Sequence, residues 1–420
     1  MEVAPHAATA NPRPTAGDSG PDADPARWRM LALLAVSELL GMSLWFAASA
    51  VSSQLAERWS LTSSQTAWLT SSVQLGFVFG TAGSALFNLA DIVPARRLFA
   101  VSAAAGAVAN AALLVAPSFA LALVSRLTTG IFLAGVYPPA MKMGSTWFRS
   151  QRGLAVGTIV GALTVGKAGP YLVHAIPGAG VVPVVLSASG AAIVAALLVL
   201  SGYRDGPYAF PPRPFSWGLV GTVLRERRWR LATGGYLGHM FELYSFWTWI
   251  PAYLAASLAA SSTAEAAAGH QSLIAAVSFA AIAIGGAGCV WGGLVADRRG
   301  REWLVTTAMA VSGTCALLSA AVFGGPFPIV VALALVWGIF VIADSAQFSV
   351  LVTESVPPHA VGTALTVQTS VGFLLTLVTI QGAAALAAAI GWRWTFPGLA
   401  LGPALGIAAI RRLPRRPAPR

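Results

Sequence analysis

Long apolar segments restrict the fold of this chain more than any other feature. Stretches of about 20 mostly apolar residues recur from end to end, each long enough to cross a hydrocarbon layer roughly 30 Å thick as a helix. Inside a bilayer a helix also satisfies its backbone hydrogen bonds internally. We expect twelve such helices, near residues 29–51, 65–87, 97–115, 119–141, 153–173, 180–202, 230–255, 270–292, 303–323, 327–350, 360–385 and 392–411. The sequence therefore predicts an all-α polytopic membrane protein.

Composition agrees with a membrane protein and argues against other classes. Hydrophobic residues make up 56% of the chain and charged residues only 10%, whereas about a quarter of a soluble domain is charged. The net charge of +11 does not indicate a nucleic-acid partner, because the arginines gather in short loops rather than along one face. The lipid bilayer is the expected partner.

Enzyme, cofactor and metal chemistry are not indicated. The glycine-rich stretches form no phosphate-binding loop linked to a strand. Neither of the two Walker motifs that bind nucleoside triphosphates is present, so ATP-driven transport is not expected. The five histidines and two cysteines lack the spacing of a metal site. We expect no metal and no cofactor.

The loop arginines predict the orientation in the membrane. If the N-terminus is cytoplasmic, nearly all of them fall on the cytoplasmic side, as the positive-inside rule requires. We therefore expect an inner (plasma) membrane protein with both termini in the cytoplasm. The expected parts are a disordered cytoplasmic N-terminus at 1–28, a six-helix half at 29–202, a cytoplasmic linker at 203–229, a second half at 230–411 and a basic cytoplasmic tail at 412–420.

An internal repeat divides the chain. Three kinds of matching stretch recur about 205 residues apart: a basic turn after an aspartate, a glutamate followed seven residues later by tryptophan, and an Ala-Val-Gly-Thr sequence. The pairs are Asp91 and Asp297, Glu38/Trp45 and Glu242/Trp249, and Ala155–Thr158 and Ala360–Thr363. The repeat predicts two pseudo-symmetric six-helix bundles. Transporters with this architecture have their binding site between the bundles, near the midplane of the membrane.

Two motifs resemble a known family. Gly293-x-x-x-Asp297-Arg298-x-Gly300-Arg301 is similar to the loop signature between helices 8 and 9 of the major facilitator superfamily, and Arg126-Leu-Thr-Thr-Gly130 resembles its helix-4 motif. The first basic turn departs from the signature, with Ile92 and Pro94 at two of its positions. The resemblance covers roughly residues 29–411. It implies a twelve-helix fold, secondary transport by alternating access, and a central cavity lined by helices 1, 4, 7 and 10. Within the superfamily the chain looks like bacterial metabolite and anion permeases.

Ionisable side chains inside membrane helices are costly and commonly mark a functional site. We expect proton coupling by Glu38, His239, Glu242 and Asp344. His239 and Glu242 are three residues apart and share a helix face, so they could exchange a proton, or form a fixed hydrogen bond. Glu38 and Arg126 are expected to form either a switchable or a permanent buried pair.

Substrate and gate residues follow from the remaining charges. Arg126 and Lys167 would attract an anion, although Lys167 could instead extend to the outer interface. Gln347, Tyr244 and Trp249 are expected to line the same site. For the gate we expect Asp91 and Arg96 in the first basic turn and Asp297, Arg298 and Arg301 in the second; the alternative is that these charges only set the topology.

The sequence thus predicts a monomeric secondary active transporter that moves a small metabolite, an organic anion, together with protons. A drug/proton antiporter exporting amphiphilic compounds is the main alternative, favoured by the acidic residues and by a partial helix-5 glycine-proline motif. A membrane sensor without transport is a lower alternative.

Overall fold

The computed structural model describes residues 24–208, 215–261 and 270–414, without the side chains of Ala90 and Asp91. Most of the expected N-terminal region and the end of the expected basic tail therefore lie outside the described residues. So does the side chain of the gate candidate Asp91.

The regular elements of the described residues are all helices. In the first half they are α1 (Ala26–Met42), α2 (Ala47–Ala50), α3 (Ser52–Trp59), α4 (Ser63–Leu86), α5 (Leu89–Ile92), α6 (Ala95–Ala111), η2 (Ala112–Val115), α7 (Phe119–Leu133), α8 (Tyr137–Ser145), α9 (Arg152–His174) and α10 (Val181–Gly202). In the second they are α11 (Trp217–Arg225), α12 (Arg227–Ser261), α14 (Gln271–Ala283), α15 (Gly285–Arg299), α16 (Arg301–Val322), α17 (Phe327–Ala343), α18 (Ser345–Thr353), η3 (Pro358–Ala360), α19 (Val361–Ile390), α20 (Trp392–Thr395), η4 (Phe396–Ala400) and α21 (Leu401–Arg411).

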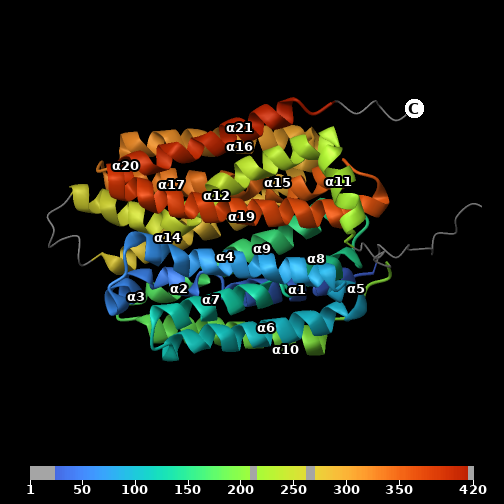
Figure 1. Cartoon of the computed structure of the whole chain (residues 1–420), viewed down its shortest axis with the longest axis horizontal. Helices are drawn as coiled ribbons and strands as arrows, with labels where there is room; N and C mark the ends of the chain where they lie inside the picture. The colour runs from blue at the N-terminus through green and yellow to red at the C-terminus, as the bar shows by residue number, and fades with distance from the viewer. Residues whose placement is uncertain (1–23, 209–214, 262–269, 415–420) are drawn as a thin grey trace, which may run out of the picture.

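The helices form two groups that run roughly parallel to one long axis. Figure 1 shows α1–α10, in blue and green, on one side of the molecule and α12–α21, in yellow to red, on the other. Within the described residues, eight helical segments are long and apolar enough to cross a membrane. The other four expected crossings are helical as well, but α1, α4, α12 and α21 are shorter or more polar than those eight. The short helix α11 lies inside the expected linker.

Several of the long segments are interrupted. The first crossing breaks between Met42 and Ala47, the fourth between Leu133 and Tyr137, and the tenth at Asp344. A break leaves backbone groups without their helical partners, and in a membrane these groups need other hydrogen bonds. The breaks therefore place polar backbone next to the buried charges described below.

The two halves meet along three helix pairs, α4 with α19, α9 with α15 and α9 with α14. Small residues bring the second pair close: a Cβ atom added to Gly157 would lie 2.8 Å from the carbonyl oxygen of Cys289, and one added to Gly161 would lie 2.8 Å from that of Gly286. Close backbone approach at small residues is how membrane helices commonly associate. The first pair is joined by the Phe77 and Phe373 rings, whose centroids are 4.6 Å apart.

Candidate functional site

Lys167 lies on α9 at the contact between the halves, and its side chain is only 2% exposed. Its ammonium nitrogen lies 4.0 Å from the ring centroid of Trp45, 4.8 Å from that of Tyr244 and 5.3 Å from that of Trp247. It also donates a hydrogen bond of 2.5 Å to the Tyr244 hydroxyl. Trp45 comes from the first half and the other two rings from α12 of the second. We call these four residues the lysine cage.

Further aromatic rings close the cage. Trp45 contacts Phe77 and Phe373 with centroid distances of 5.1 and 5.8 Å, and Tyr244 contacts Phe373 at 5.3 Å. All of these rings are buried, so the cage is closed to solvent in this structure. Lys167 is thus buried between the halves and does not extend to the outer interface, and its role in binding an anion stays a prediction.

Glu38 lies on α1 beside the cage and is fully buried. The helices α1 and α9 touch there, because a Cβ atom added to Gly166 would lie 2.1 Å from the Leu39 carbonyl oxygen. Within the described residues, neither carboxyl oxygen of Glu38 has a hydrogen-bond partner, and no ion pair within 4.0 Å joins it to a base. Glu38 is therefore a buried acid without a fixed partner.

Arg126 does not pair with Glu38, and our expectation of that pair is wrong. Its guanidinium group donates hydrogen bonds to Asn110 Oδ1 at 2.6 Å and to the carbonyl oxygens of Leu44 and Trp45 at 3.0 and 2.7 Å. The two carbonyls belong to the break between α1 and α2, where the helical partners are lost. Arg126 thus stabilises the broken backbone that presents Trp45 to Lys167.

His239 pairs with Asp344 rather than with Glu242, so the expected His239–Glu242 pair is also wrong. His239 Nδ1 lies 2.9 Å from Asp344 Oδ1, and both side chains are 2% exposed. The imidazole also packs against Tyr236 and Phe348, at centroid distances of 6.3 and 5.3 Å. Asp344 occupies the break between α17 and α18, so the pair joins α12 to the middle of the tenth crossing.

Glu242 points into the second half. One carboxyl oxygen accepts a 2.8 Å hydrogen bond from the Ser312 hydroxyl on α16, and the other accepts one of 2.8 Å from the Trp337 indole on α17. Both donors lie outside the lysine cage. The residue that matches Glu38 in the internal repeat therefore has two fixed partners where Glu38 has none.

Of the other expected substrate residues, only Tyr244 is in the cage. Gln347 is buried on α18, one turn from Asp344. Trp249 lies further along α12, where its indole donates a 3.0 Å hydrogen bond to the Ile380 carbonyl oxygen and packs against Trp392. The sequence reasoning did not assign Trp45 to the site or Asn110 to the support of Arg126. The position of Asn110, a polar amide within an apolar membrane segment, could have indicated that it has a buried hydrogen-bond partner.

The second basic turn joins α15 to α16. It lies at the end of the molecule where Figure 1 also shows α5 and α11. The Asp297 carboxylate lies against the first turn of α9: a Cβ atom added to Gly153 would be 2.5 Å from its Oδ2 atom. A carboxylate in this position is favoured by the positive end of the helix dipole. Arg301 forms an ion pair of 3.0 Å with Glu354 at the end of α18. Arg298 is exposed here, as is Arg96 on α6.

Comparisons with known proteins agree with this architecture. The crystal structure of the nucleoside transporter NupG, in a mutant form, matches with a TM-score of 0.68 and 14% identity, covering 91% of this chain and 99% of that one. A bacterial homologue of the human lysosomal transporter Spinster, inward-facing and unoccupied, matches with a TM-score of 0.68 and 15% identity, covering 93% and 98%. At these identities the likeness shows the fold alone.

No curated protein matches the chain significantly by sequence. The sequence model of the Major Facilitator Superfamily, however, matches residues 33–380, which is most of the chain. The resemblance found in the basic turn and in helix 4 is thereby confirmed. With its two helical halves and this match, the chain belongs to the Major Facilitator Superfamily of membrane transporters.

Proposed function

We propose that this transporter moves a small organic anion together with protons, by alternating access. The observation that carries the proposal is the buried Lys167, held at the contact between the halves by a hydroxyl and three aromatic rings rather than by a carboxylate. A binding site between the halves is the arrangement that alternating access requires.

The partners of Lys167 suit exchange with a substrate anion. A cation–π contact contributes about 0.5–2 kcal/mol. The Tyr244 hydroxyl accepts a hydrogen bond from the charged ammonium group but is itself neutral. A substrate carboxylate would add the attraction between opposite charges, which is strong away from water, and can therefore replace the Tyr244 hydroxyl at the ammonium group. Arg126 is not suited to this exchange, because its bonds to Asn110, Leu44 and Trp45 hold the helix break.

Glu38 supports coupling to protons. A substrate carboxylate at Lys167 would be repelled by an ionised Glu38 on the neighbouring helix, since like charges disfavour each other at short range. Protonation of Glu38 removes this repulsion, so proton and anion would bind together. The buried His239–Asp344 pair is the second candidate for coupling to protons. The two donors on Glu242 favour a structural role for that carboxylate over proton exchange.

The basic turn supports a role in gating. Asp297 of the second half contacts the first turn of α9 in the first half, so a rocking motion that separates α9 from α15 must break this contact. We assign Arg301 to holding α16 against α18 through Glu354. We further propose that the protein acts as a monomer in the inner membrane with both termini in the cytoplasm.

A proton-flux experiment tests the proposal. Purified protein is reconstituted in liposomes that contain the pH-sensitive dye pyranine, and a panel of mono- and dicarboxylates is added outside. We expect at least one anion to cause proton entry, and the Lys167→Met variant to abolish it. The chain contains one other lysine, Lys142, so Lys142→Met is the matched control and should retain the flux. Unchanged flux in the Lys167 variant would contradict an anion site at the cage.

The drug/proton antiporter remains the second candidate, favoured by one observation. Among the residues that the structure describes, Glu38 is a buried carboxyl group without a hydrogen-bond partner, and it lies beside an aromatic cluster, an environment that also suits an amphiphilic cation. The same liposomes distinguish the two: an amphiphilic cation that drives protons in the opposite direction, with no response to carboxylates, would favour export of cations.

A further inference from the structure

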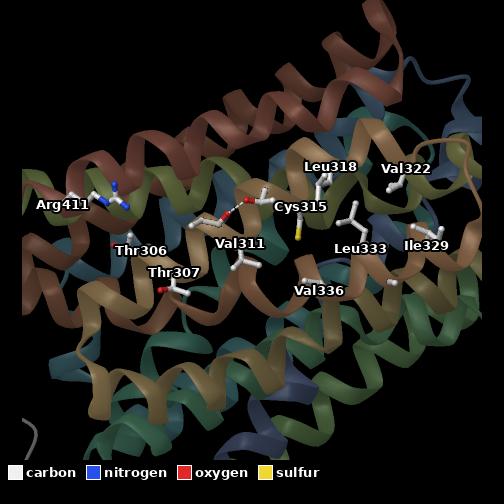
Figure 2. A pocket seen from close by; sticks show the side chains of 13 residues that line it. Thr306, Thr307, Val311, Cys315, Leu318, Val322, Ile329, Leu333, Val336 and Arg411 are labelled. Atoms are coloured by element: carbon white, nitrogen blue, oxygen red, sulfur yellow. Dashed lines mark hydrogen bonds between the residues drawn. The ribbon is translucent and has the colours of Figure 1, made fainter.

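A groove of about 810 Å³ lies on the outer face of the second half, between α16, α17 and the end of α21. Figure 2 shows Arg411, Thr306 and Thr307 at one end of the groove and Val322 and Ile329 at the other. It is separate from the lysine cage, because the helices that form it pack within the second half.

The groove faces the hydrocarbon of the membrane. Leu318, Ile329 and Val336 line it and are 48%, 53% and 42% exposed, as expected for side chains that contact lipid. We propose that it binds an anionic glycerophospholipid of the leaflet in which α21 ends. One acyl chain would lie between α16 and α17, and the phosphate would bind Arg411.

The charge and the hydroxyl groups at one end identify the headgroup. Within the described residues, Arg411 carries the only charge that lines the groove, and no carboxylate lies within 4.0 Å of its guanidinium group. A guanidinium group binds phosphate oxygens with two parallel hydrogen bonds. Within the residues that the structure describes, the side chains of Thr306 and Thr307 donate no hydrogen bond. The Thr314 hydroxyl, in contrast, donates one of 2.7 Å to the Ala310 carbonyl oxygen, which Figure 2 marks with a dashed line. Two hydroxyls are thus available beside Arg411.

The part of the groove between Thr306 and Leu318 suits one leaflet. These two residues are separated by twelve residues of α16, which is about 18 Å along the helix axis, and the groove continues to Val322, about 24 Å from Thr306. Half of a bilayer with its headgroups is roughly 20 Å thick. A lipid whose phosphate lies at Arg411 therefore ends its acyl chain near Leu318, where the lining is apolar.

Lipid retention by the full-length protein tests this proposal. Purified protein is incubated with phosphatidylglycerol or phosphatidylcholine, and the bound lipid is counted by native mass spectrometry. Loss of one arginine near a membrane surface corresponds to about a five-fold loss of anionic-lipid binding. We expect this loss for Arg411→Gln, and no loss for Arg412→Gln, whose side chain does not line the groove.

A second variant separates the groove from the charge. Ala332 is an exposed residue that lines the groove, so Ala332→Trp should fill it and reduce the retention of both lipids. Inorganic phosphate in place of lipid should not compete, because it cannot occupy the apolar part. Equal phosphatidylglycerol retention by the wild type and the Arg411 variant, loss with Arg412→Gln alone, or displacement by phosphate would overturn the proposal.

Discussion

The ammonium group of Lys167 and the hydroxyl of Tyr244 lie 2.5 Å apart, and they belong to different halves of the transporter. Any motion that separates α9 from α12 must break this hydrogen bond. The same ammonium group is our proposed binding site for the substrate anion. The bond thus links substrate binding to the position of the halves, because the anion and Tyr244 compete for one donor.

Replacing Tyr244 with Phe should therefore strengthen anion binding. The variant keeps the ring over Lys167 and removes only the competing hydroxyl. A hydrogen bond to a charged group contributes about 1.5–3 kcal/mol, which is roughly ten-fold or more in affinity. We expect a correspondingly lower KM for the anion found in the liposome assay. Tyr171→Phe is the control, because within the described residues the buried Tyr171 hydroxyl has no hydrogen-bond partner to lose. An unchanged KM in the Tyr244 variant would show that the hydroxyl does not compete.

Replacing Glu38 with Gln should make anion uptake independent of pH. In the wild type, uptake should fall as the pH rises, because ionised Glu38 repels the substrate carboxylate. The glutamine side chain is neutral at every pH, so uptake by the variant should persist at alkaline pH without accompanying protons.

The measurements are labelled-anion uptake across a pH series and the pyranine signal. Glu242→Gln is the control variant, because Glu242 matches Glu38 in the internal repeat. Anion uptake by this variant should keep the pH dependence of the wild type. Proton entry that continues in the Glu38 variant would assign the coupling to another group, with His239–Asp344 the next to test.

The helices of this protein were predictable because their signal is local. The apolar segment expected at 153–173 is α9, Arg152–His174, since the length of a crossing is set by the thickness of the bilayer. The family could also be found, because a basic turn has a short motif that needs no knowledge of distant residues. These features depend only on residues close together in the chain.

The partners of the buried charges were not predictable in this way. Three-residue spacing placed His239 and Glu242 on one face of α12, but residues three apart still differ by about 60° around the helix axis. The packing of the neighbouring helices therefore gives one side chain Asp344 as its partner and the other Ser312 and Trp337. Arg126 likewise binds backbone carbonyls that are available only because the first crossing breaks between α1 and α2. Such contacts depend on how distant helices pack, and the sequence pattern of one helix does not contain that information.

The hydrogen bonds of Glu242 lead to a prediction on stability. Removing the Trp337 indole with Trp337→Phe leaves one buried carboxyl oxygen without its donor, and a bond to a charged group contributes about 1.5–3 kcal/mol. We expect a lower unfolding temperature in detergent with the KM for the anion unchanged. Trp303→Phe is the control on an exposed indole of α16. A loss of proton coupling in the Trp337 variant, without loss of stability, would instead place Glu242 in the proton pathway.

The contact between α1 and α9 provides the last prediction. A Cβ atom added to Gly166 would lie 2.1 Å from the Leu39 carbonyl oxygen, so Gly166→Ala must push α1 away from α9 and move Glu38 relative to Lys167. Overpacking of this kind costs about 1–3 kcal/mol, and transport should fall together with the unfolding temperature. Gly169→Ala, on the same helix, is the matched control: its added Cβ would have its nearest neighbour at 3.9 Å, and alanine favours a helix more than glycine does. If both variants transport and unfold like the wild type, the close approach at Gly166 is not needed to hold Glu38 beside the lysine cage.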